Sequence, residues 1–204
     1  MSAAVGWVLV GLALGAVASR RHGVAACLVG AQTLLVAAAA LIPPDGAGGH
    51  RLAALLLAIK GAAVCGIVAF ALSRARETRP PDDGPAVAIR LLVATVLALG
   101  LVVLLPTSAL GDPETGRAAI VLLACGLALT LVRRATVAVV LALLIAENGI
   151  ALAAVWMPGG LPLVVELGVA FDVIVVVAVA AFFQRRIVEA FGTGDSAALG
   201  SLRG

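Results

Sequence analysis

Short breaks rich in proline, glycine and arginine divide this sequence into long apolar stretches. A soluble domain of 204 residues that is 63% hydrophobic and only 12% charged could not cover so much apolar surface, whereas lipid can solvate it. A helix needs about 20 apolar residues to cross the hydrocarbon core. Breaks in hydropathy therefore predict membrane spans at residues 3–18, 23–42, 51–73, 86–105, 117–132, 135–156 and 161–184.

The predicted fold is all-α: one polytopic transmembrane helical bundle of about seven spans over residues 1–204, with a tail at 185–204 and no soluble catalytic domain. The stretch 117–132 is short, so it either crosses fully or forms a half-span paired with the next one. Turn residues fill the breaks, as in Gly111-Asp112-Pro113. Met1 to Gly15 contain no Lys or Arg, unlike the basic start of a signal peptide, and we expect the first stretch to be a retained helix.

Basic residues are distributed unequally between the two sides that seven spans create. With the N-terminus outside, 11 of the 14 Lys and Arg residues fall on the cytoplasmic side. The outer side receives Arg51 and Arg117, and Lys60 lies within a span. This excess predicts a multi-pass protein of the inner (plasma) membrane with its C-terminus in the cytoplasm. The cytoplasmic set is Arg20, Arg21, Arg74, Arg76, Arg79, Arg90, Arg133, Arg134, Arg185, Arg186 and Arg203.

Four ionisable residues lie inside predicted spans, and they are our candidates for a proton relay: Lys60, Glu147, Glu166 and Asp172. A charged side chain at mid-span costs about 2.5 to 3.5 kcal/mol on insertion scales, so such residues usually face a protein interior or a water-filled path. Lys60, Glu147 and Asp172 fall near the midplane, and Glu166 lies closer to the outside. Desolvation penalises a carboxylate anion, which suits Glu147 to taking up and releasing protons.

Structural explanations of these polar residues stay open. Glu147 or Asp172 could pair with Lys60 as a link between helices, and Glu166 could extend to the headgroups. Hydrogen bonding between helices is sufficient to explain Gln32 in the second stretch. A G-x-x-x-G pattern on the first stretch, Gly11 and Gly15, permits close helix contact, but it also arises easily by chance among 23 glycines.

Several classes of function lack their sequence signals. The chain contains no phosphate-binding glycine loop, no H-E-x-x-H motif and no haem-ligand pair. Its three cysteines are isolated within apolar stretches, as inert buried thiols are. We therefore expect no catalytic residue, cofactor or metal in this chain itself, and no nucleic-acid partner.

The last third of the chain carries a more specific pattern. A basic turn at Arg133-Arg134 precedes the triplet Glu147-Asn148-Gly149, Val165-Glu166-x-Gly168 is followed by Asp172, and the last stretch ends at Arg185-Arg186. This arrangement resembles hydrogenase-4 component E, a membrane subunit of formate-hydrogenlyase-type and related group 4 nickel–iron hydrogenase complexes. Residues 133–184 are also similar to the small three-helix subunit of respiratory complex I and its counterpart in Mrp-type cation/proton antiporters.

The resemblance implies a non-catalytic membrane subunit of a hydrogenase-4-like or complex I-like oxidoreductase, contributing to proton translocation and anchoring. Its partners would be antiporter-like and hydrogenase membrane subunits and a peripheral metalloprotein arm. The complex I subunit carries one membrane glutamate on each of two successive helices, which Glu147 and Glu166 match, whereas Asp172 matches the hydrogenase component. Two alternatives are a subunit of a cation/proton antiporter assembly and a purely structural membrane anchor.

Overall fold

The computed structural model describes residues 3–41, 85–107, 112–133 and 136–156, with isolated positions at 55, 58, 59, 61, 62, 66, 178 and 182. The described secondary structure is all-helical, as predicted. Its five long helices are α1 (Ala3–Ala18), α2 (His22–Ala39), α4 (Val87–Leu104), α5 (Pro113–Val132) and α6 (Thr136–Trp156). Of the predicted spans, 51–73 and 161–184 lie outside the described ranges apart from isolated positions.

Four of these helices are long and apolar enough to cross a membrane: α2, α4, α5 and the part of α6 from Val137 to Ala154. Helix α1 is apolar but shorter, since its 16 residues rise by about 24 Å. The hydropathy breaks therefore placed the described helices correctly, and the described part of the chain has the helices of a membrane protein.

Helix α5 is longer than predicted, because it begins at Pro113 rather than near residue 117. The Asp112 carboxylate caps it, accepting hydrogen bonds from the Thr115 backbone N–H at 3.2 Å and from the Thr115 hydroxyl at 2.6 Å. Proline suits the first helical position because its missing N–H would have no partner there. The hydroxyl bond from Thr115 holds the pKa of the Asp112 carboxyl below its ordinary value. The apparent turn is thus a helix start, and α5 has 20 residues, the length of a full span.

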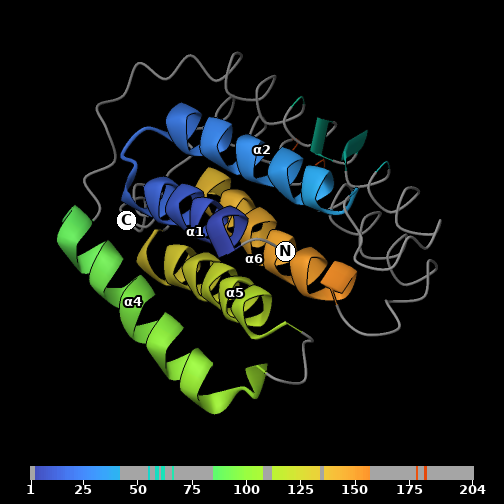
Figure 1. The fold of residues 1–204 in the computed structure, drawn as a ribbon. Coiled ribbons are helices and arrows are strands. Elements are labelled where there is room, and N and C mark those ends of the chain that lie inside the picture. Colours follow the sequence, from blue (N-terminus) through green and yellow to red (C-terminus); the bar gives the residue numbers. More distant parts are fainter. Residues whose placement is uncertain are drawn as a thin grey trace, which may run out of the picture.

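The helices pack side by side as antiparallel pairs (Figure 1). In the first pair, Gly15 of α1 lies beside Leu28 of α2, and in the second, Gly126 of α5 lies beside Ala142 and Ala146 of α6. The pairs join where α1 packs on α5 and α2 packs on α6, while α4 covers the outer side of α5 and α1. Helices α1 and α5 consequently run in one direction, and α2, α4 and α6 run in the other.

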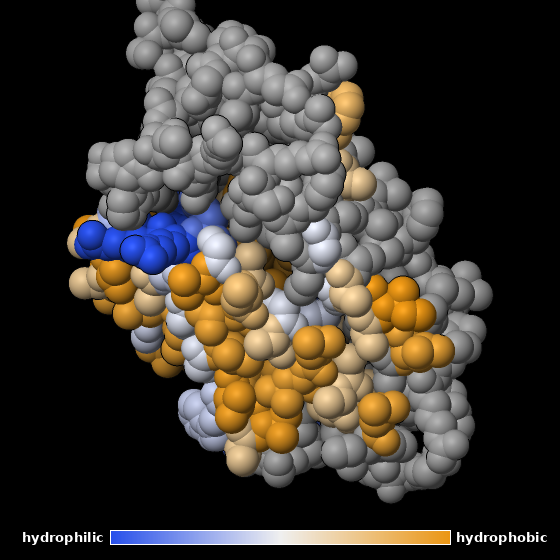
Figure 2. Space-filling view, turned by 90° about the horizontal axis from the view of Figure 1, so that it is seen from above, coloured by the Kyte–Doolittle hydropathy of each residue, from blue (hydrophilic) through white to orange (hydrophobic). Residues whose placement is uncertain are grey.

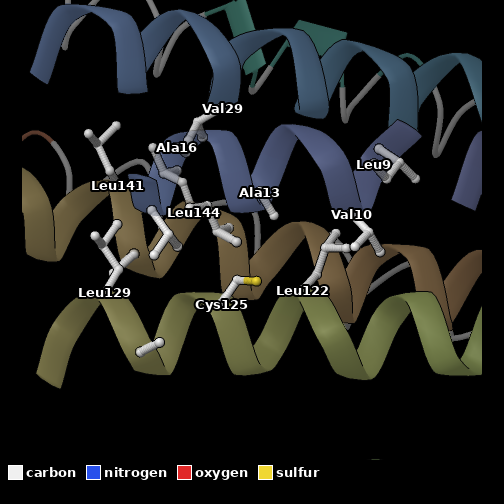
Figure 3. Close-up of a cluster of buried hydrophobic side chains, with 14 of the residues drawn as sticks. Leu9, Val10, Ala13, Ala16, Val29, Leu122, Cys125, Leu129, Leu141 and Leu144 are labelled. Carbon is white, nitrogen blue, oxygen red and sulfur yellow. The ribbon is translucent and has the colours of Figure 1, made fainter. Parts of the chain in front are cut away.

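The interior is built from small side chains and the exterior from large apolar ones. Alanine is the most frequent apolar residue buried in the described part of the chain, as in membrane bundles whose helices approach closely. Figure 3 shows Leu122, Cys125 and Leu129 of α5 turned toward α1 and α6. On α4, by contrast, Leu92 is 63% exposed, Leu99 63% and Val103 84%. Figure 2 shows apolar residues over much of the coloured part of another face. Apolar exposure on this scale is unusual for a soluble monomer but ordinary for a surface that lipid covers.

Basic residues gather at one end of the bundle, where α1 and α5 end and α2, α4 and α6 begin. Arg90 Nε donates to the Pro85 carbonyl at 2.8 Å, Arg90 Nη1 lies 3.4 Å from the Ser19 carbonyl, and Arg133 Nη2 donates to that same carbonyl. Both arginines are buried. The carbonyls of the last turn of a helix have no partner within that helix, and cations near them are stabilising. Two arginines from other helices thus cap α1.

The exposed arginines of this end are Arg20 and Arg21, in the turn between α1 and α2. Figure 2 shows a hydrophilic patch at its left edge, the side on which Figure 1 draws that turn. The opposite end carries the start of α5, where Arg117 pairs with Glu114 at 2.8 Å.

Candidate functional site

Glu147 lies near the middle of α6 and its side chain is 3% exposed. Its helix is apolar over most of its 21 residues, so the carboxyl group is held far from both ends of the span. This is the placement predicted for Glu147. The other three candidates, Lys60, Glu166 and Asp172, lie outside the described residues.

A buried polar cluster adjoins Glu147, and it consists of Asn148 of α6 with Gln32 and Thr33 of α2. The Asn148 amide Nδ2 donates to Gln32 Oε1 at 3.1 Å and to Thr33 Oγ1 at 3.0 Å. Gln32 Nε2 then donates to the Leu9 carbonyl of α1 at 3.2 Å. The cluster therefore connects three helices at mid-depth, and the prediction that Gln32 makes hydrogen bonds between helices is confirmed.

Thr33 bonds both to its own helix and to Asn148. Its hydroxyl oxygen lies 3.0 Å from the Val29 carbonyl, one turn earlier on the same helix, and 3.2 Å from Asn148 Oδ1. One hydroxyl proton can be donated to either acceptor, while the oxygen accepts from Asn148 Nδ2. Interhelical hydrogen bonds in membrane proteins contribute about 0.6 kcal/mol each on average and up to about 1.7. The hydrogen bonds of the cluster therefore contribute little free energy, but they constrain how α2 and α6 are oriented.

Gly61 brings a further segment to the cluster. A Cβ atom added at Gly61 would lie 2.7 Å from Thr33 Cγ2, so only glycine permits this approach without movement. Gly61 follows Lys60 directly in the sequence. Gly61, the residue after Lys60, therefore lies against the methyl group of Thr33, a member of the polar cluster.

Gly149 explains how α6 can pack so closely on α5. A Cβ atom there would come within 2.7 Å of the Ala119 carbonyl oxygen and 3.1 Å of Leu122 Cβ. Gly126 repeats this on α5, where a Cβ would lie 2.7 Å from the Ala142 carbonyl oxygen. The first-span pattern is different: Gly15 meets Leu28, but around Gly11 there is open space within 4 Å among the described residues.

The triplet Glu147-Asn148-Gly149 therefore puts an acid, an amide and a glycine on three different sides of one turn of α6. Gly149 lies against α5, Asn148 bonds to α2, and Glu147 is buried. Sequence reasoning identified Glu147 and Gln32 as polar residues in apolar stretches. It missed Thr33, because threonine is common in membrane helices and does not stand out in an apolar stretch. It also missed the hydrogen bonds of Asn148 and the close helix contacts at Gly126 and Gly149.

A carboxyl group buried inside an apolar bundle can hold a proton or release it to a neighbour. Comparison of this chain with family models, with curated proteins and with solved structures finds no match.

Proposed function

We propose that this chain is a non-catalytic membrane subunit of a hydrogenase-4-like or complex I-like oxidoreductase, in which it helps to couple electron transfer in partner subunits to proton movement. The observation that carries the proposal is the burial of Glu147 near the middle of α6, where the next residue, Asn148, belongs to the polar cluster. The class of complex comes from the resemblance of the segment from Arg133 onward.

Glu147 is the proton-carrying group of this proposal. Among the described residues it is the acid that the helices bury, whereas Asp112 and Glu114 lie at the start of α5. An acid at such a depth is costly to insert, and its usual use is in a path for ions or protons. Glu166 exchanges protons with Glu147, and Asp172 and Lys60 adjust the proton affinity of both through their charge.

The proposed orientation has seven spans, the N-terminus outside and the C-terminus in the cytoplasm. Support comes from the basic end of the bundle, because Arg20, Arg21, Arg90 and Arg133 meet around Ser19. The chain also leaves α2 at the opposite end and enters α4 at this one, which is what one further span between them requires. Under the positive-inside rule this end faces the cytoplasm.

Reporter fusions test the orientation. A reporter that is active in the cytoplasm should work when fused after Gly204, and a reporter that is active outside should work when inserted at residues 43–50, since the two sites lie on opposite sides. The matched control exchanges the two reporters, which should silence both. Activity of one reporter at both sites contradicts the span count.

Purification tests the proposed complex. The chain, tagged and extracted from its native membranes with a mild detergent, should copurify with larger membrane subunits and with a peripheral metalloprotein arm, because a subunit with buried ionisable groups acts through its neighbours. Mass spectrometry of the purified material identifies them. Copurification with antiporter subunits and no metalloprotein supports an antiporter assembly instead, and a monodisperse chain without partners overturns the proposal.

A further inference from the structure

The Asn148 amide lies where α6 meets α2, and through Gln32 it is connected to α1. An amide does not ionise, so Asn148 cannot itself store a proton. Its two N–H groups are directional donors that hold α6 at one rotation about its axis relative to α2. Asn148 therefore acts on position rather than on charge.

Close packing holds the side of α6 that faces α5. At Gly149 and Gly126 the backbones of α5 and α6 approach closely, with small side chains such as Ala142 and Ala146 between them. Larger side chains such as Leu122 pack beside these contacts, and together they set the separation of the two helices. The hydrogen bonds of Asn148 add a directional constraint on the rotation of α6 at its α2 side.

Glu147 directly precedes Asn148 on this helix, and neighbouring residues point about 100° apart. Any rotation that moves the Asn148 amide away from Gln32 and Thr33 turns the Glu147 carboxyl group by the same angle. We propose that Asn148 is a positioning residue: its amide, held by Gln32 and Thr33, fixes the direction in which Glu147 presents its carboxyl group. This inference rests on the proposed proton function of Glu147.

Thr33 offers the sharpest test, because its hydroxyl and its methyl group have separate contacts. The hydroxyl oxygen lies 3.0 Å from Asn148 Nδ2, and the methyl group faces Gly61. Thr33→Val keeps the shape and removes the hydroxyl. Thr33→Ser keeps the hydroxyl and removes the methyl group, so the pair separates the hydrogen bond from the packing.

The measurement is made on the assembled complex in native membranes. Thr33→Val should lower the population of the positioned state about threefold to twentyfold, the range that interhelical hydrogen bonds carry. The rate of substrate-driven proton movement should fall by up to that factor, while Thr33→Ser should keep most of the wild-type rate. A difference infrared spectrum reports on the acid directly. The carbonyl band of the protonated Glu147 carboxyl, identified by its loss in Glu147→Gln, should shift in Thr33→Val and return in Thr33→Ser.

The outcomes distinguish this inference from the function on which it rests. Unchanged coupling in Glu147→Gln overturns the proton function and the positioning role with it. Loss of coupling in Glu147→Gln, with wild-type coupling and an unshifted band in Thr33→Val, overturns the positioning role alone. If Thr33→Val assembles poorly, Thr33→Ala supplies the variant without a hydroxyl, and an unshifted band there overturns the inference in the same way.

Discussion

Replacing Glu147 with glutamine should abolish most proton movement while leaving the complex assembled. Glutamine keeps the length and hydrogen-bonding ability of the side chain, but it cannot alternate between a charged and a neutral form. A positioned proton-transfer group contributes about a hundredfold or more to rate, so the rate of substrate-driven proton uptake should fall by at least about that factor. Substrate-driven proton uptake and complex yield, measured on the same membranes, report the two quantities separately.

Glu147→Asp is the matched control for this experiment. It keeps the acid but shortens its reach, and it should retain part of the coupling. If Glu147 only holds helices together, the pattern reverses: Glu147→Gln assembles poorly, or couples normally once assembled. That result would favour the structural-anchor alternative.

The second large effect is expected at Gly149, where alanine should destabilise the protein. The added Cβ would lie 2.7 Å from the Ala119 carbonyl oxygen, and because this atom belongs to the backbone, α5 and α6 must separate. Overpacking of this kind costs about 1 to 3 kcal/mol. The free energy of unfolding should fall by that amount in denaturant titrations of the purified complex followed by helical circular dichroism.

Gly100→Ala is the control, since Gly100 is exposed on α4 and a Cβ there meets nothing within 4 Å among the described residues. Alanine is favoured over glycine inside a helix by about 0.5 to 1 kcal/mol, so this variant should be as stable as the wild type or more so. Equal destabilisation at Gly149 and Gly100 would contradict the close approach of α5 and α6.

Hydropathy was sufficient to locate the described helices, because a membrane span needs only length and apolar character. It missed the first turn of α5, since Gly111-Asp112-Pro113 is typical of a turn although Asp112-Pro113 is also a helix start. Asp112 followed by Pro113 is the sequence signal that correctly indicates the start of this helix.

The candidate site was predictable only in part. Glu147 and Gln32 stand out because each is polar within an apolar stretch. The partner of Asn148 lies 115 residues away at Thr33, and no local pattern encodes such a pairing. Glycine is likewise too frequent in this chain for sequence to separate Gly149, which meets α5, from Gly100, which meets open space. The partner of Asn148 and the surroundings of Gly149 both depend on which helices pack together, and hydropathy does not determine that.

The capping of α1 by Arg90 and Arg133 sets an order for biosynthesis. These arginines follow Ser19 by 71 and 114 residues, so a ribosome completes α1 long before it makes either of them. Until α4 and α5 have entered the membrane, the carbonyl end of α1 depends on water and lipid headgroups for its hydrogen bonds. A nascent chain that stops between Arg90 and Arg133 has one of the two caps, and the arrival of Arg133 completes the pair.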